Sequence, residues 1–129
     1  MPTEKHLEMI QAAITRMAGN SFQLKAWNVA LTSAVIGFAA AKESHPRAAA
    51  FALAPALVFW LLDGYYLGLE TAFRNLYDGA VSGTVLPYVM TPQPTVWIWI
   101  KAFFRPSVLF IHAVLVAMIF EVTLLRYSL

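Results

Sequence analysis

Apolar residues recur along the chain first at helical spacing and then in three long runs. Over residues 3–19 the apolar positions fall three or four residues apart, with charged and amide side chains between them. This spacing predicts an amphipathic helix over residues 3–19, with Thr3 as its N-cap. Its apolar stripe is expected to pack against the rest of the protein or to lie in a membrane interface. Gly19-Asn20-Ser21 is expected to end this helix.

The three apolar runs cover residues 22–41, 48–69 and 106–125. A helix of about 20 residues is about 30 Å long, which is the thickness of the hydrocarbon core of a bilayer. We therefore expect an all-α membrane protein, with the N-terminal amphipathic helix followed by three transmembrane helices. The second helix is expected to continue past residue 69 into the cytoplasm, and Pro106 suits the first position of the last helix. A single membrane domain over residues 1–129 follows.

An aromatic segment, residues 96–104, precedes the third run. Trp97, Trp99, Phe103 and Phe104 surround Lys101, and aromatic residues beside a cation are typical of a membrane boundary. The alternation of Val, Trp and Ile also allows a short strand packed on the protein. We favour the membrane boundary.

The composition supports a lipid environment. Of the 129 residues, 60% are hydrophobic and 12% are charged, where soluble domains average about 25% charged residues. This composition excludes a disordered chain. A net charge of +2 without a clustered basic face argues against nucleic acid as a partner. The expected partners are membrane lipid and other copies of the chain.

No sequence motif supports catalysis. The chain has no cysteine, nucleophile elbow, phosphate-binding loop or paired metal-ligand spacing. We therefore expect no enzyme activity, no cofactor and no metal site.

The distribution of Lys and Arg predicts the orientation in the membrane. With three spans, the N-terminus and the second connection lie on one side, and this side carries six of these residues against three on the other. The richer side is cytoplasmic, so we expect a multi-pass membrane protein with a cytoplasmic N-terminus. The six residues are Lys5, Arg16, Lys25, Arg74, Lys101 and Arg105, and the three are Lys42, Arg47 and Arg126.

The second span carries a polar and aromatic stripe. At about 100° per residue, one helix face gathers Asp63, Tyr66, Glu70, Arg74 and Tyr77. One interpretation is structural: Glu70 pairs with Arg74 four residues later, and Asp63 hydrogen-bonds a neighbouring helix. In the other, copies of the chain form a ring and the stripe lines an aqueous passage.

A second face of the same helix carries small residues, Gly64, Gly68 and Ala72. Small residues four apart let another helix backbone approach closely in lipid. In the third span, His112 and Glu121 point to opposite faces and cannot form one site. His112 is expected to make a hydrogen bond between helices, whereas His6 and His45 are expected to be solvated.

Two motifs give the sequence a resemblance to a known family. Residues 16–27 and 59–78 resemble the signatures of the RipA-like octameric membrane proteins, to which the pore-forming accessory protein of Cas13b-type CRISPR systems is related. The resemblance implies a ring of eight subunits in the inner membrane, with roles in envelope physiology or in membrane depolarisation during phage defence. The family-like positions are Asn20, Ser21, Lys25, Trp27, Asp63, Tyr66, Glu70, Phe73, Arg74 and Tyr77.

Three functions follow from these observations. The first is a homo-oligomeric ring with a central pore that changes membrane permeability. The second is a non-conducting membrane scaffold, and the third is a holin-like protein that permeabilises the membrane. The expected lack of a further cytoplasmic domain after the last span argues against a partner-sensing role.

Overall fold

The structure of the protein is a computed structural model, and it describes residues 3–39, 41 and 48–128. These residues form four α-helices, α1 (Glu4–Ala39), α2 (Leu53–Ser82), α3 (Val96–Phe103) and α4 (Pro106–Ser128), with a short 3-10 helix η1 (Ala48–Ala52) before α2. No strand occurs among them. The expected all-α class is therefore confirmed, and the strand alternative for residues 96–104 is wrong. His45 lies outside the described residues.

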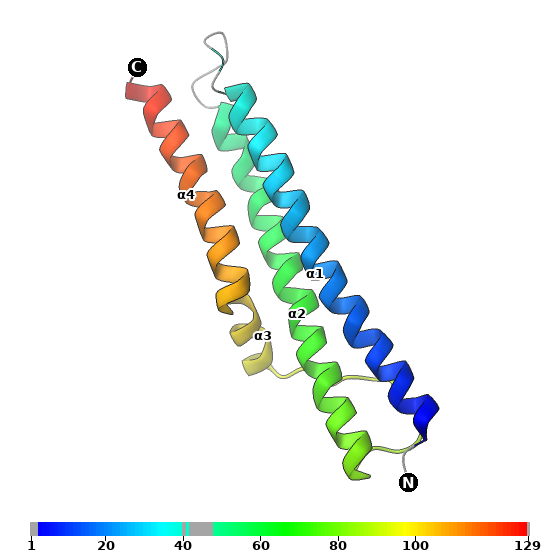
Figure 1. The fold of residues 1–129 in the computed structure, drawn as a ribbon. Coiled ribbons are helices and arrows are strands. Elements are labelled where there is room, and N and C mark those ends of the chain that lie inside the picture. The colour runs from blue at the N-terminus through cyan, green and yellow to red at the C-terminus, as the bar shows by residue number, and fades with distance from the viewer. Residues whose placement is uncertain (1–2, 40, 42–47, 129) are drawn as a thin grey trace.

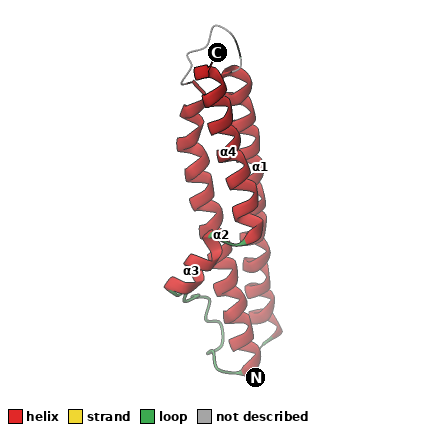
Figure 2. Cartoon of the chain, turned by 90° about the vertical axis from the view of Figure 1, so that its left-hand side faces the viewer, coloured by secondary structure: helices red, strands yellow, loops and turns green. Residues whose placement is uncertain are grey.

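The helices make an elongated bundle of unequal thickness. α1 and α2 lie side by side and antiparallel along most of their length, and α4 packs only against the half that contains the C-terminus (Figure 1). α3 lies beside α2 where α4 begins, at the level where the bundle thins from three helices to two (Figure 2). One half is thus a three-helix bundle, and the other is a hairpin of α1 and α2 alone.

α1 is one continuous helix of 36 residues. Its predicted start is confirmed, because the Thr3 hydroxyl accepts a hydrogen bond from the His6 amide at 3.2 Å. The predicted break at Gly19-Asn20-Ser21 is wrong. A helix-interior glycine costs about 1 kcal/mol. Packing on α2 offsets this cost, because the buried positions Ile14, Ser21 and Leu24 continue one stripe on both sides of Gly19.

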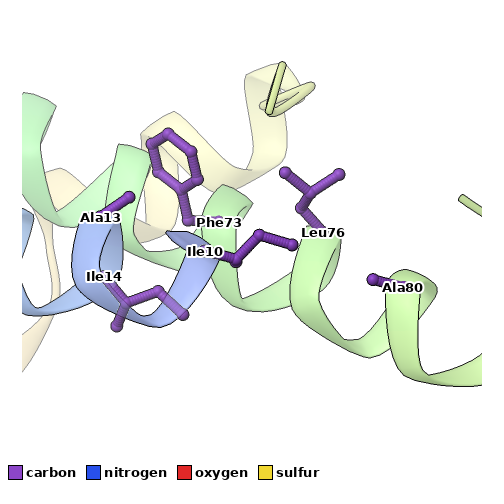
Figure 3. Close-up of a cluster of buried hydrophobic side chains, with 6 residues drawn as sticks. All are labelled: Ile10, Ala13, Ile14, Phe73, Leu76 and Ala80. Atoms are coloured by element: carbon purple, nitrogen blue, oxygen red, sulfur yellow. The ribbon is translucent and has the colours of Figure 1, made fainter. Parts of the chain in front are cut away.

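The apolar stripe of residues 3–19 packs against the protein. Ile10, Ala13 and Ile14 of α1 are buried against the far end of α2 (Figure 3). Their partners on α2 are Phe73, Leu76 and Ala80. This cluster explains why α2 continues as a helix to Ser82, well past the predicted span.

His6 is buried, so the prediction that it is solvated is wrong. Its Nε2 lies 2.8 Å from the carbonyl oxygen of Val89, in the connection between α2 and α3. The neighbouring Tyr88 has a positive φ of 62°, and its ring centroid lies 5.8 Å from that of His6. The histidine therefore ties this connection to the first turns of α1.

The glycines of α2 receive aromatic side chains. A Cβ at Gly64 would lie 2.1 Å from Cδ1 of Phe103, and one at Gly68 would lie 2.6 Å from Cε3 of Trp99. The predicted close approach at these positions exists, but the neighbours are side chains of α3 and not another helix backbone. Thr95 is the N-cap of α3, and its hydroxyl accepts a hydrogen bond from the Ile98 amide at 3.3 Å.

Two segments of the described chain are long and apolar enough to cross a membrane, Ala48–Ser82 and Pro106–Ser128. α4 begins at Pro106, as predicted. The first predicted span, residues 22–41, is not among these segments; its part up to Ala39 lies in α1. Gln23, Lys25 and Asn28 lower the hydropathy of this run. The next subsection places Lys25 and Asn28 together with Ser21 and Thr32.

Candidate functional site

A cluster of polar side chains lies inside the three-helix half of the bundle. It draws on three helices that are far apart in sequence. We call it the buried polar cluster, and its members are Ser21, Lys25, Asn28 and Thr32 of α1, Asp63 of α2 and His112 of α4.

Asp63 is the centre of the cluster. Its Oδ1 accepts a short hydrogen bond from the Ser21 hydroxyl and another from Lys25 Nζ at 2.9 Å. Its Oδ2 lies 2.8 Å from Lys25 Nζ and 2.8 Å from His112 Nε2. The side chains of Asp63 and His112 are 0% exposed, and that of Lys25 is 18% exposed. The expected hydrogen bond from Asp63 to a neighbouring helix is thus present, and it reaches two helices.

The partners of His112 determine its tautomer. Its Nδ1 lies 2.7 Å from Nδ2 of Asn28, which has only protons to give, so Nδ1 accepts. Nε2 then carries the proton and donates it to Asp63. The Asn28 oxygen in turn accepts from the Thr32 hydroxyl at 3.1 Å, and the Trp60 ring stacks on the imidazole at 6.4 Å between centroids. The expected role of His112 as an interhelix contact is confirmed.

The cluster is electrically balanced. Lys25 supplies one positive charge, Asp63 one negative charge, and His112 is neutral in the tautomer derived above. A charged group in lipid is expensive, so such residues pair inside a bundle. Every polar side-chain atom that reaches Asp63 donates to it, which leaves the carboxylate fully partnered. The arrangement is suited to fixing the register of α1, α2 and α4 against one another.

The polar stripe of α2 is divided between two environments. Asp63 faces the interior of the bundle, whereas Glu70 and Arg74 form the predicted pair one turn apart, with Arg74 Nη2 to Glu70 Oε1 at 2.9 Å. The Glu70 carboxylate is buried and the Arg74 side chain is 58% exposed. Tyr66 and Tyr77 are half-buried, and Tyr77 packs on the cluster shown in Figure 3. The five stripe residues therefore do not share one site.

The remaining predicted positions are also distributed. Among the family-like residues of α1, Ser21 and Lys25 belong to the buried polar cluster, Asn20 is half-buried and Trp27 is exposed. Ala72 is buried, in line with close packing on its face of α2. Glu121 is exposed on α4.

A row of small residues follows the outward face of α1. All its members are exposed, they recur at intervals of three or four, and they lie about 180° around the helix from the buried stripe. Seven of the eight are Gly, Ala, Ser or Thr. No other atom lies within 4 Å of a Cβ built at Gly19 or Gly37. We call this the small-residue row: Ala12, Thr15, Gly19, Gln23, Ala26, Ala30, Ser33 and Gly37.

Reasoning from the sequence missed the small-residue row and two members of the buried polar cluster, Asn28 and Thr32. The predicted break at Gly19 hid the row, because the helical register was not carried across it. Asn28 and Thr32 do carry a signal: Asn28 follows Lys25 by three residues, and Thr32 follows Asn28 by four, which places all three on one helix face. The helix face that Asn28 and Thr32 share with Lys25 can be recognised as buried only when Lys25 is known to point into the bundle.

Comparisons of the chain with protein families, with curated proteins and with solved structures find no match.

Proposed function

We propose that this protein is a subunit of a homo-oligomeric membrane assembly in which copies meet through the small-residue row of α1. The row carries the proposal. In lipid, apolar surface gives no driving force for association, and helices associate where small residues let their backbones come close. An exposed row over 26 residues, from Ala12 to Gly37, has no partner among the residues that the structure describes. A second copy supplies a partner of matching geometry.

We also propose that α1 crosses the membrane, as a third transmembrane helix beside α2 and α4. Its polar side chains Ser21, Asn28 and Thr32 are buried in the bundle. The outward surface of the same half keeps large apolar residues such as Phe22, Trp27 and Phe38. Two of the strongly polar residues that lower the hydropathy of α1, Lys25 and Asn28, are thus turned into the bundle, whereas a third, Gln23, lies on the outward face.

In the orientation that follows, the half of the bundle that consists of α1 and α2 alone extends into the cytoplasm of a bacterial cell. Figure 1 places the N-terminus at this end and the C-terminus at the other, as three spans require. In a variant with cysteine at Thr3 or Ser128, a membrane-impermeant thiol reagent applied from outside is expected to label only Ser128→Cys. The chain has no native cysteine to interfere. Labelling of Thr3→Cys from outside intact cells would contradict the orientation.

Mutation of the small-residue row is expected to dissociate the assembly. Ala26→Leu/Ala30→Leu puts two bulky side chains where backbones must meet, and overpacking of this kind should weaken association about 10- to 100-fold. Ala113→Leu/Ala117→Leu makes the same change on the exposed face of α4 and is the matched control. Native mass spectrometry reads the subunit number of each. A wild-type monomer, or an unchanged oligomer in the row variant, would contradict the proposal.

We propose further that the assembly is a ring of inner-membrane subunits around a passage for ions, which acts in envelope physiology or phage defence. The resemblance of residues 16–27 and 59–78 to the octameric family supports the ring. Arg74, paired with a buried Glu70 and itself exposed, supplies a charge near the cytoplasmic mouth. Planar-bilayer recording of the intact oligomer tests this step. An oligomer without conductance would leave the scaffold function instead, and conductance without a stable oligomer would indicate a holin-like protein.

A further inference from the structure

A cavity of about 740 Å³ opens between α2, α3 and the first residue of α4. Its charged lining residues are all cationic: Arg74, Lys101 and Arg105. Arg74 is an exposed residue of α2, Lys101 lies in the last turn of α3, and Arg105 is the second of the two residues between α3 and α4. No acidic residue lines the cavity. Pockets of a few hundred to 1,000 Å³ are of the size that holds small ligands.

The cations of this cavity are incompletely neutralised. Arg74 pairs with Glu70 at 2.9 Å, and Lys101 Nζ lies 5.2 Å from the ring centroid of Trp97. Within the described residues, neither Lys101 nor Arg105 forms an ion pair. Two uncompensated cations beside a partly neutralised third make a site for a negatively charged group.

A second, apolar cavity of about 410 Å³ shares one lining residue, Phe104, with the first. Leu57, Trp60 and Leu61 of α2 line it, on the part of that helix that is long and apolar enough to span the membrane. Phe104 borders both cavities. The cationic and the apolar cavity therefore lie on either side of Phe104, close to the residue where α4 begins.

We infer that the two cavities hold one anionic phospholipid, with its phosphate among Arg74, Lys101 and Arg105 and an acyl chain along Leu57 and Leu61. Basic pockets between helices at the membrane boundary recognise anionic headgroups. Trp97 and Phe104 flank the phosphate position, as aromatic residues do at the interface. The apolar chamber distinguishes a lipid from free phosphate, because a soluble anion would leave it unfilled. The inference rests on the membrane location of the proposed function but not on the oligomer.

The test is selective retention of lipid. Protein is taken from nanodiscs of phosphatidylcholine with a minor fraction of phosphatidylglycerol, and native mass spectrometry counts the lipids that stay bound to each chain. We expect wild-type protein to be enriched in phosphatidylglycerol. Lys101→Gln/Arg105→Gln should lower the enrichment about 30-fold, the loss expected for two cations near a membrane surface. Equal retention of both lipids by the wild type would overturn the inference, whatever its subunit number.

Two further arms separate the alternatives. Lys5→Gln/Arg16→Gln removes the same charge from exposed positions of α1 and should leave the enrichment unchanged. An equal loss of enrichment in this control would show that general surface charge alone attracts the lipid, and it would contradict the inferred site. An excess of glycerol 3-phosphate should not displace the bound lipid, whereas displacement would show that the phosphate alone is recognised. If the double variant does not fold, by circular dichroism, Arg105→Gln alone should give a partial loss, and its full retention of the lipid would contradict the site.

Discussion

Replacement of Asp63 by alanine is expected to destabilise the protein more than any other single change to the buried polar cluster. The Asp63 carboxylate accepts hydrogen bonds from α1 and α4 at once. Its removal leaves the Lys25 ammonium facing the bundle interior and the buried His112 ring without its acceptor. Breaking a buried charge pair costs about 3–5 kcal/mol. Thermal unfolding in detergent, followed by circular dichroism, should show the loss.

Two variants make this expectation specific. Asp78→Asn removes the charge of an exposed aspartate on the same helix and should leave stability within about 0.5 kcal/mol of the wild type. Lys25→Met/Asp63→Leu replaces both charges by apolar side chains of similar size. Because no charge is then left unpaired, the double variant should recover the share of the loss that comes from the unpaired Lys25 ammonium, while the His112 and Ser21 donors still lack their acceptor. An Asp63→Ala protein as stable as the wild type would show that the pair does not hold the bundle together.

Gly64→Leu is expected to displace α3 from α2. The Phe103 ring occupies the space that a Cβ at this position would need. Overpacking of this kind costs about 1–3 kcal/mol, and the value here should lie in the upper part of that range. Hydrogen–deuterium exchange over residues 96–103 should rise. The subunit number should stay the same, since the glycine face is covered by the chain's own helix.

A compensating variant checks the reason for this effect. Gly64→Ala alone meets the ring of Phe103, whereas Gly64→Ala/Phe103→Ala leaves room for the added methyl group. Exchange in α3 should therefore rise in Gly64→Ala. Phe103→Ala alone measures how much exchange rises when the ring is lost. Exchange in the double variant should not exceed that of Phe103→Ala, because the added methyl group then meets no ring. Unchanged exchange in Gly64→Leu would contradict the packing of α3 on α2.

The helix ends could be predicted from local chemistry, and the pairing of helix faces could not. Thr3 as an N-cap and Pro106 at a first helical position follow from the needs of a helix terminus, which involve only neighbouring residues. Gly19 also carries a local signal, and it was misleading, because packing over the whole length of α1 outweighs a cost of about 1 kcal/mol. At such positions, tertiary packing determines whether the helix continues or ends.

The buried polar cluster shows the same limit. Asp63 and His112 are recognisable as unusual residues in apolar runs, but their sequence separation of 49 residues leaves their contact undetermined. Their meeting depends on how α2 and α4 are rotated about their axes. The burial of His6 depends likewise on the path of the connection that brings Val89 to it, which has no periodic pattern to read. For Gly64 and Gly68, the spacing predicts a close approach but does not say whether a backbone or an aromatic ring makes it.

The sequence separation of 38 between Lys25 and Asp63 also has a consequence for how the protein is synthesised. During synthesis α1 emerges first, and its Lys25, Asn28 and Thr32 then have no partners to satisfy them. A lysine at the centre of a lone spanning helix disfavours insertion by about 2.5–3.5 kcal/mol on translocon scales, and Lys25, near the start of the run over residues 22–41, would cost less. Asp63 arrives only with the following helix. If α1 spans the membrane as proposed, the two helices should therefore enter the bilayer best as a pair, with the acidic residue of the second neutralising the lysine of the first.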